Sequence, residues 1–168
     1  MIQLIWKNLP ATELGQSVLK ANWDRLNVDR GNMPFLSGDA LALALTFFGL
    51  GNERLLLGQA NGHIFAMLLL ANAGKLRWQT FQPSQIPLGA WVADASLPIE
   101  DLADSLLQSG AVRLGLSLSL TQIDPLFAPH SDDSGNNRHD DYIATAWVDI
   151  VGSFDDYWPP AARTSAKT

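Results

Sequence analysis

Apolar and polar residues alternate at the start of the chain and then recur at helical spacing. The alternation over residues 2–6 predicts a short strand that Pro10 closes. Apolar residues three and four positions apart then predict a helix over 12–27. The alanine- and leucine-rich stretch 40–48 predicts a second helix, and Gly49 stands where a left-handed C-terminal residue is expected. Two helices therefore follow the first strand.

The clearest local signal is a hairpin centred on Asn61-Gly62. This pair tolerates positive φ at both central positions of a type I′ turn, and strand-like stretches flank it at 55–60 and 63–70. Another turn then leads into a third strand over 75–81. The pattern predicts a three-stranded antiparallel meander.

The remaining elements complete a mixed fold. Residues 82–97 are irregular and rich in amides, and a helix runs from Pro98 to Gly110. A strand over 112–120, a polar loop over 121–141 and a last strand over 142–151 follow. The order β-α-α-β-β-β-α-β-β predicts an α/β (α+β) fold, with a mixed, largely antiparallel sheet flanked by helices.

Length and composition fit one domain with its own core. The chain has 168 residues, 47% of them hydrophobic. The longest apolar stretches, 40–50 and 64–71, are shorter than the about 18 residues that a membrane helix needs. No signal-peptide pattern is present at the start, and cysteine is absent, which excludes thiol catalysis and disulfides. We expect no membrane span and a cytoplasmic protein.

Charge narrows the possible partners. Residues 1–84 carry seven basic and five acidic groups, whereas residues 85–168 carry four basic and twelve acidic groups. Nucleic acid is a poor partner for such a surface, because both carry negative charge.

Several motifs together resemble a known family. The match lies in their joint order over about residues 1–158, and the motifs are Pro34-Phe35-Leu36-Ser37, Thr80-Phe81-Gln82-Pro83-Ser84-Gln85, Pro87-Leu88-Gly89-Ala90-Trp91, Gln122-x-Asp124-Pro125 and Asp141-Tyr142-Ile143 running into Thr145-Ala146-Trp147-Val148. The chain resembles the amino-terminal half of the CelD-like GNAT acetyltransferases, which are linked by family to cellulose and exopolysaccharide synthesis. The resemblance implies a GNAT-like fold and a FemX-like tandem arrangement. It places the acyl-CoA chemistry in a second GNAT-like half that would be missing from this chain.

The cofactor pattern of that family is incomplete here. A GNAT domain that binds acetyl-CoA or another acyl-CoA offers closely spaced glycines before a helix, so that backbone amides approach the pyrophosphate. Counted from Gln85, Gly89 arrives one place late, and Pro87 removes an amide. We therefore expect no cofactor site in this chain. The spacing of His130 and His139 likewise does not predict a metal site, and no residue is assigned as catalytic.

Two aromatic residues bracket the most distinctive polar segment. Such a mixture of aromatic faces, amides and a hydroxyl suits a saccharide or another polar acceptor, and the strand end at 122–124 is expected to share its cleft. The candidate substrate-binding residues are Trp78, Gln82, Ser84, Gln85, Trp91, Gln122 and Asp124. The alternative is a packed loop whose amides satisfy its own backbone.

Three functional hypotheses remain open. The first is a GNAT-like half that supplies acceptor-side surface to an N-acyltransferase and is an incomplete enzyme by itself. The second is a non-catalytic saccharide-binding or scaffold module. The third is a small single-domain acetyltransferase with an atypical cofactor loop.

The last ten residues, 159–168, depart from the family pattern. After Trp158 that pattern continues A-A-R-G-K-N-L-R-Q-N, whereas this chain reads P-P-A-A-R-T-S-A-K-T. Deleting one base after the tryptophan codon of a suitable coding sequence converts the first string into the second. We therefore expect a first domain over 1–158 and a frame-shifted, disordered tail. The apolar surface against which the missing second half would pack would then be exposed and would favour self-association.

Overall fold

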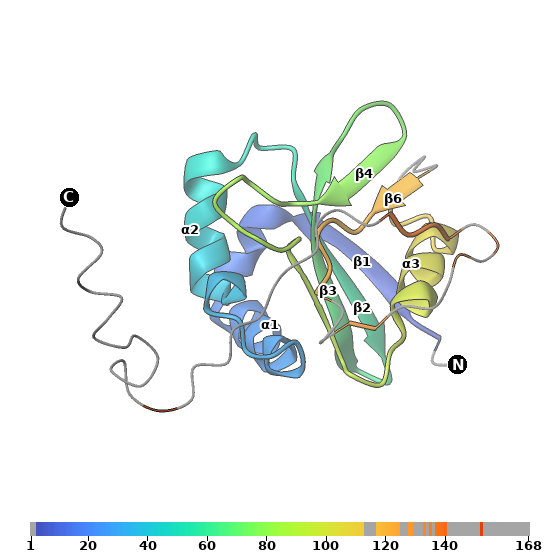
Figure 1. Ribbon diagram of the computed structural model, residues 1–168, viewed down its shortest axis with the longest axis horizontal. Coiled ribbons are helices and arrows are strands. Elements are labelled where there is room, and N and C mark those ends of the chain that lie inside the picture. Colours follow the sequence, from blue (N-terminus) through green and yellow to red (C-terminus); the bar gives the residue numbers. More distant parts are fainter. Residues whose placement is uncertain are drawn as a thin grey trace, which may run out of the picture.

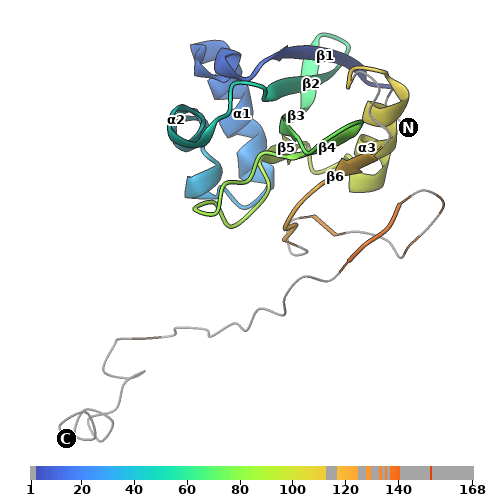
Figure 2. The ribbon, with the colours of Figure 1, turned by 90° about the horizontal axis from the view of Figure 1, so that it is seen from above.

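In the computed structural model, one mixed sheet carries helices on both of its faces (Figures 1 and 2). The structure describes residues 3–112, 117–124, 128–129, 133, 135, 137–140 and 152. The elements are β1 Ile5–Pro10, the 3-10 helix η1 Ala11–Gly15, α1 Ser17–Asp29, the 3-10 helix η2 Pro34–Leu36, α2 Gly38–Phe48, β2 Arg54–Ala60, β3 His63–Asn72, β4 Arg77–Thr80, β5 Trp91–Ala93, α3 Ile99–Gln108 and β6 Ser117–Ser119.

The sheet is largely antiparallel, as the sequence predicts. Its strands lie in the order β1-β2-β3-β4-β6, and β5 also pairs with β3. Only the pairing of β4 with β6 is parallel among the described strands. The parallel pair brings the C-terminal ends of β4 and β6 to one edge, where the segments that follow them meet.

The predicted hairpin is confirmed. Asn61 and Gly62 adopt φ of 49° and 79°, and the turn joins β2 to β3 in antiparallel register. Positive φ at both positions is the conformation that this residue pair accommodates best.

Two hydrophobic clusters lie on opposite faces of the sheet. Because side chains alternate along a strand, Leu55 and Leu57 of β2 pack with α1 and α2, while Leu56 packs with α3. Trp23 of α1 is fully buried, and its indole nitrogen donates to the carbonyl of Leu36 at 2.7 Å. Continuous apolar runs in β2 and β3 follow from this burial on both faces.

The structure corrects three local predictions. The region 82–97 is not irregular throughout, because residues 91–93 form β5. The first helical segment is divided into η1 and α1 at Gln16. Gly49 is not left-handed, since its φ is −69°. A Cβ at Gly49 would lie 2.4 Å from the carbonyl oxygen of Leu45, so close approach explains this glycine.

The predicted last strand over 142–151 and the predicted tail over 159–168 lie outside the described residues. Within the described part of the chain, every helix is too short or too polar to cross a membrane.

Candidate functional site

Threonine hydroxyls join the ends of the parallel strands β4 and β6. Thr80 is fully buried at the end of β4, and its Oγ1 lies 2.6 Å from Oγ1 of Thr121. The backbone N–H of Thr121 also donates to Thr80 Oγ1 at 2.9 Å. These contacts satisfy a buried hydroxyl and fix the segment after β6 against β4.

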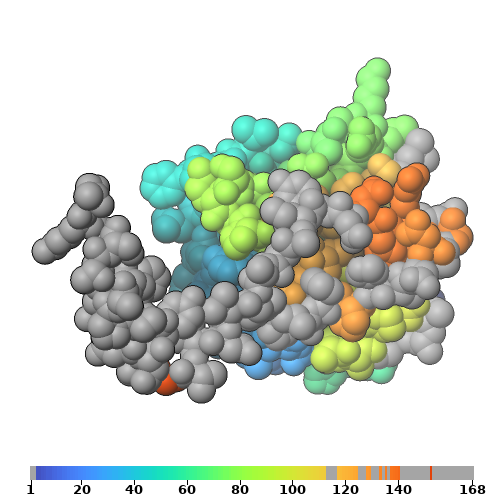
Figure 3. All heavy atoms as spheres, viewed as in Figure 1, coloured from blue at the N-terminus to red at the C-terminus, as the bar shows by residue number. Residues whose placement is uncertain are grey.

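The loop 82–90 folds onto the same point. The N–H of Gly89 donates to the carbonyl of Thr121 at 3.0 Å. A Cβ at Gly89 would lie 2.4 Å from Thr80 Oγ1 and 2.5 Å from the Thr121 carbonyl oxygen. Only glycine therefore permits this approach. Figure 3 shows the loop in yellow-green on the molecular surface, beside α2 in cyan.

Two glutamine side chains close the contact between the loop and the segment after β6. Gln82 donates from Nε2 to Oε1 of Gln122, and also approaches the carbonyl oxygens of Ile86 and Pro87 at 3.3 Å. Gln122 has a φ of 44°, a left-handed conformation that is uncommon for a residue with a side chain. The structure thus holds Gln122 in a strained conformation facing Gln82.

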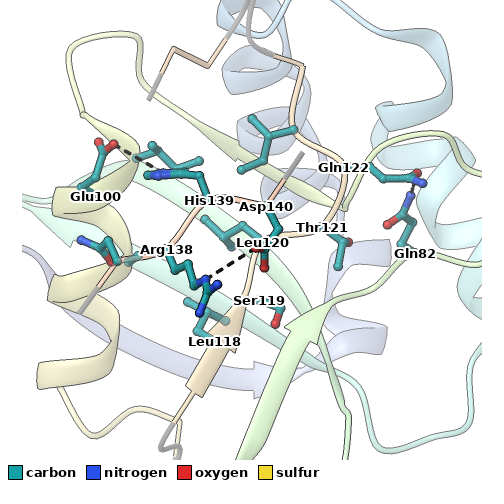
Figure 4. A pocket seen from close by; sticks show the side chains of 14 residues that line it. Gln82, Glu100, Leu118, Ser119, Leu120, Thr121, Gln122, Arg138, His139 and Asp140 are labelled. Atoms are coloured by element: carbon teal, nitrogen blue, oxygen red, sulfur yellow. Dashed lines mark hydrogen bonds and ion pairs between the residues drawn. The ribbon is translucent and has the colours of Figure 1, made fainter. Parts of the chain in front are cut away.

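A cleft of about 440 Å³ lies beside this amide pair. Its walls come from α3, from β6 with the segment after it, and from residues 137–140 (Figure 4). The lining residues are Gln82, Ile99, Glu100, Ala103, Leu118, Ser119, Leu120, Thr121, Gln122, Ile123, Asn137, Arg138, His139 and Asp140. Its volume lies within the range of small-molecule sites.

Charged and titratable groups cluster on the part of the cleft formed by α3 and residues 137–140. Nε2 of His139 lies 3.9 Å from Oε1 of Glu100, and its Nδ1 lies 3.3 Å from Oδ1 of Asp133. The His139 backbone N–H donates to the Asp133 carboxylate, and this hydrogen bond is the main reason that the pKa of Asp133 is below its ordinary value. Arg138 and Asp140 form an exposed ion pair at 3.6 Å, which contributes little to stability.

The sequence-predicted site residues fall into four environments. Gln82 and Gln122 line the cleft together. Ser84 and Gln85 are exposed on the loop 82–90 and do not line the cleft. Trp78 is half-buried and packs against the hydrophobic cluster beneath α3.

Trp91 and Asp124 belong to a different neighbourhood. Trp91 is 3% exposed, and the guanidinium carbon of Arg30 lies 3.9 Å from its ring centroid. Asp124 is close enough to Arg30 to act on its charge, since it favours the protonated form of that residue. Burial and the stacked guanidinium limit the ring surface of Trp91 that a saccharide could reach.

Sequence reasoning did not select Glu100, Arg138 or His139 for the site. His139 falls in the predicted polar loop, where its spacing gives no metal or catalytic motif. The residues that α3 contributes to the cleft and residues 137–140 are more than 30 positions apart in the sequence, so no local periodicity could predict their contact. The acidic first turn of α3 was the one available signal, since such residues favour a helix N-terminus.

The start of α3 is a poor place for a pyrophosphate. Glu100 and Asp101 lie in its first turn, and Pro98 precedes it as N-cap. Two carboxylates repel an anion that the helix dipole would otherwise attract, and proline offers no N–H. Among the described residues, no group of three or more His, Cys, Asp or Glu side chains could hold a metal ion.

Comparison with known proteins adds no relative: no family model matches the chain, and neither a curated protein nor a solved structure matches it significantly.

Proposed function

We propose that this chain is the acceptor-side, GNAT-like half of an N-acyltransferase of the CelD-like type. In this proposal its cleft holds a hydroxyl-rich saccharide acceptor, whose amino group takes the acyl group. Acyl-CoA binding and the transfer step belong to a second half that this chain does not contain.

The observation that carries the proposal is the paired amides of Gln82 and Gln122 at the cleft. Nε2 of Gln82 is engaged by Gln122 Oε1 and by the carbonyl oxygens of Ile86 and Pro87. The capacity that this pair keeps for a ligand therefore lies in the amide oxygen of Gln82 and the amide nitrogen of Gln122. Apolar residues on the neighbouring walls, including Ile99 and Leu120, offer contact to the less polar face of a sugar ring. An apolar lining with a few placed polar groups is typical of small-molecule sites.

The hydrogen bonds of the loop 82–90 support the proposal that acyl-CoA does not bind to this loop. Three of its amides donate within the fold: Ile86 to Pro83, Gly89 to Thr121, and Ala90 to Phe81. Amides engaged in this way are not free to bind a pyrophosphate. The acidic first turn of α3 adds electrostatic repulsion to this loss.

The rival proposal is a saccharide-binding or scaffold module that takes part in no transfer. It uses the same cleft and predicts the same binding. The two proposals differ when a second GNAT-like half is supplied, because only the first predicts acyl transfer to an amino group of the bound saccharide.

Titration calorimetry tests the binding claim with two probes, a short β-glucan such as cellotetraose and acetyl-CoA. We expect saturable heat from the glucan and none from acetyl-CoA. Gln82→Ala should weaken glucan binding at least tenfold, because it removes an amide from the cleft. Gln85→Ala is the matched control on the exposed side of the same loop and should bind as the wild type does. Saturable heat from acetyl-CoA, or none from the glucan, would overturn the proposal.

A further inference from the structure

A second pocket shares the residue Ile99 with the cleft. It has a volume of about 210 Å³ and is lined by the end of α1, by β5 and by residues 94–99, together with Ala128 and Pro129. A pocket of this volume has room for a small molecule. Ile99 lines both the pocket and the cleft.

Arg30 is fixed at the wall of this pocket. It is the C-cap residue of α1 and only 2% exposed. Its Nη1 donates to the carbonyl oxygen of Trp91, and its guanidinium stacks on the indole ring of the same residue. A buried guanidinium held by two contacts is oriented before any ligand arrives.

One edge of this guanidinium forms no hydrogen bond with the described residues. Nε and Nη2 of Arg30 are buried and make no hydrogen bond within the described part of the chain. In an arginine these two nitrogens direct parallel N–H groups to the same side, the arrangement that binds both oxygens of a carboxylate. Trp91 also lines the pocket, and its indole Nε1 is a third buried donor that makes no hydrogen bond with the described residues.

The charge of Arg30 persists at neutral pH. Burial lowers its pKa to about 10, and Asp124 opposes this shift. The guanidinium therefore remains protonated, and its unpartnered donors are costly to leave unsatisfied in the interior.

Acidic residues around the pocket restrict the kind of anion that can bind next to Arg30. Asp29 accepts from the N–H of Ala95, and Asp94 accepts from the N–H and hydroxyl of Ser96. These carboxylates line the same pocket and would repel a doubly charged phosphate more strongly than a singly charged group.

We propose that this pocket binds a small monocarboxylate, which pairs with the Nε–Nη2 edge of Arg30 while the indole N–H of Trp91 provides a further donor. The site is independent of the ligand proposed for the cleft. Its occupant would lie next to that cleft, since both contact Ile99.

Nuclear magnetic resonance of the arginine Nε–H and tryptophan Nε1–H groups tests this proposal. The protein is titrated with sodium acetate, sodium glucuronate and sodium phosphate at constant ionic strength. We expect acetate or glucuronate to shift the Arg30 and Trp91 signals saturably, and phosphate to bind at least tenfold more weakly. No saturable shift with either carboxylate would mean that water alone fills the pocket and would overturn the proposal. Tighter binding of phosphate would overturn it as well.

Two variants locate the effect. Arg30→Lys keeps the positive charge but loses the paired N–H edge, so carboxylate binding should fall at least tenfold. Arg25→Lys is the matched control, since Arg25 is an exposed arginine on the same helix. Equal loss of affinity in both variants would contradict the assignment. The wild-type titration decides the proposal even where Arg30→Lys fails to fold.

Discussion

Replacing Gly89 by alanine tests the junction between the loop 82–90 and the segment after β6. The added Cβ would lie 2.4 Å from Thr80 Oγ1 and 2.5 Å from the Thr121 carbonyl oxygen. Both distances are far below van der Waals contact. One of the two atoms is backbone, so the junction must open to admit the methyl group.

The cost follows from the contacts that open. Overpacking of a tight site costs about 1–3 kcal/mol, and losing the hydrogen bond from Gly89 to Thr121 adds about 1 kcal/mol. We expect Gly89→Ala to lower the free energy of unfolding by about 2–4 kcal/mol. For a chain of this length, such a loss corresponds to a decrease in melting temperature of roughly 4–16 °C.

Urea denaturation of wild type and variant measures this loss. Gly15→Ala is the matched control, because a Cβ at Gly15 meets no atom within 4 Å. It should change the free energy of unfolding by less than about 0.5 kcal/mol. Equal stability of Gly89→Ala and Gly15→Ala would refute the close approach of loop and strand end.

Two further predictions concern stability. Leu41→Ala should lower the free energy of unfolding by about 2–5 kcal/mol, because the side chain of Leu41 in α2 is fully buried. Phe47→Ala on the same helix should lower it by less than about 0.5 kcal/mol, because Phe47 is 71% exposed, and chemical denaturation of the two variants compares them. The hydrogen bond from the hydroxyl of Ser96 is the main reason that the pKa of Asp94 is lowered. The ionised Asp94 therefore adds to the free energy of unfolding, fully above the ordinary carboxyl pKa, and this contribution is lost as the pH falls through the lowered pKa. Asp94→Asn should therefore reduce the acid sensitivity of unfolding below about pH 4, which denaturation at a series of pH values measures.

Local signals predicted the elements well where short-range chemistry decides the conformation. The Asn61-Gly62 turn is an example, since its two positive φ values require only residues that tolerate them. The glycine positions were harder to interpret. Gly49 and Gly89 are both required by close approach of other atoms, which no feature of the surrounding sequence reveals. Gly51, two residues further on, takes the positive φ that was expected at Gly49.

The candidate site was predictable only in part. Gln82 and Gln122 were expected in one cleft because strand ends at one sheet edge bring their following segments together, and both line it. The contact of Glu100 with His139 depends on how residues 137–140 lie against α3, which no spacing encodes. The burial of Trp91 depends on the stacking of Arg30, which lies far away in the sequence.

The central claim is that the cleft beside Gln82 and Gln122 binds a hydroxyl-rich acceptor and that this chain does not bind acyl-CoA. The most direct measurement is a pair of titrations that follow the side-chain amide signals of both glutamines by nuclear magnetic resonance. The account predicts that cellotetraose shifts both signals saturably, while acetyl-CoA shifts neither these signals nor the backbone amides of α3. Saturable shifts at the start of α3 with acetyl-CoA, or unchanged glutamine signals with cellotetraose, would contradict it.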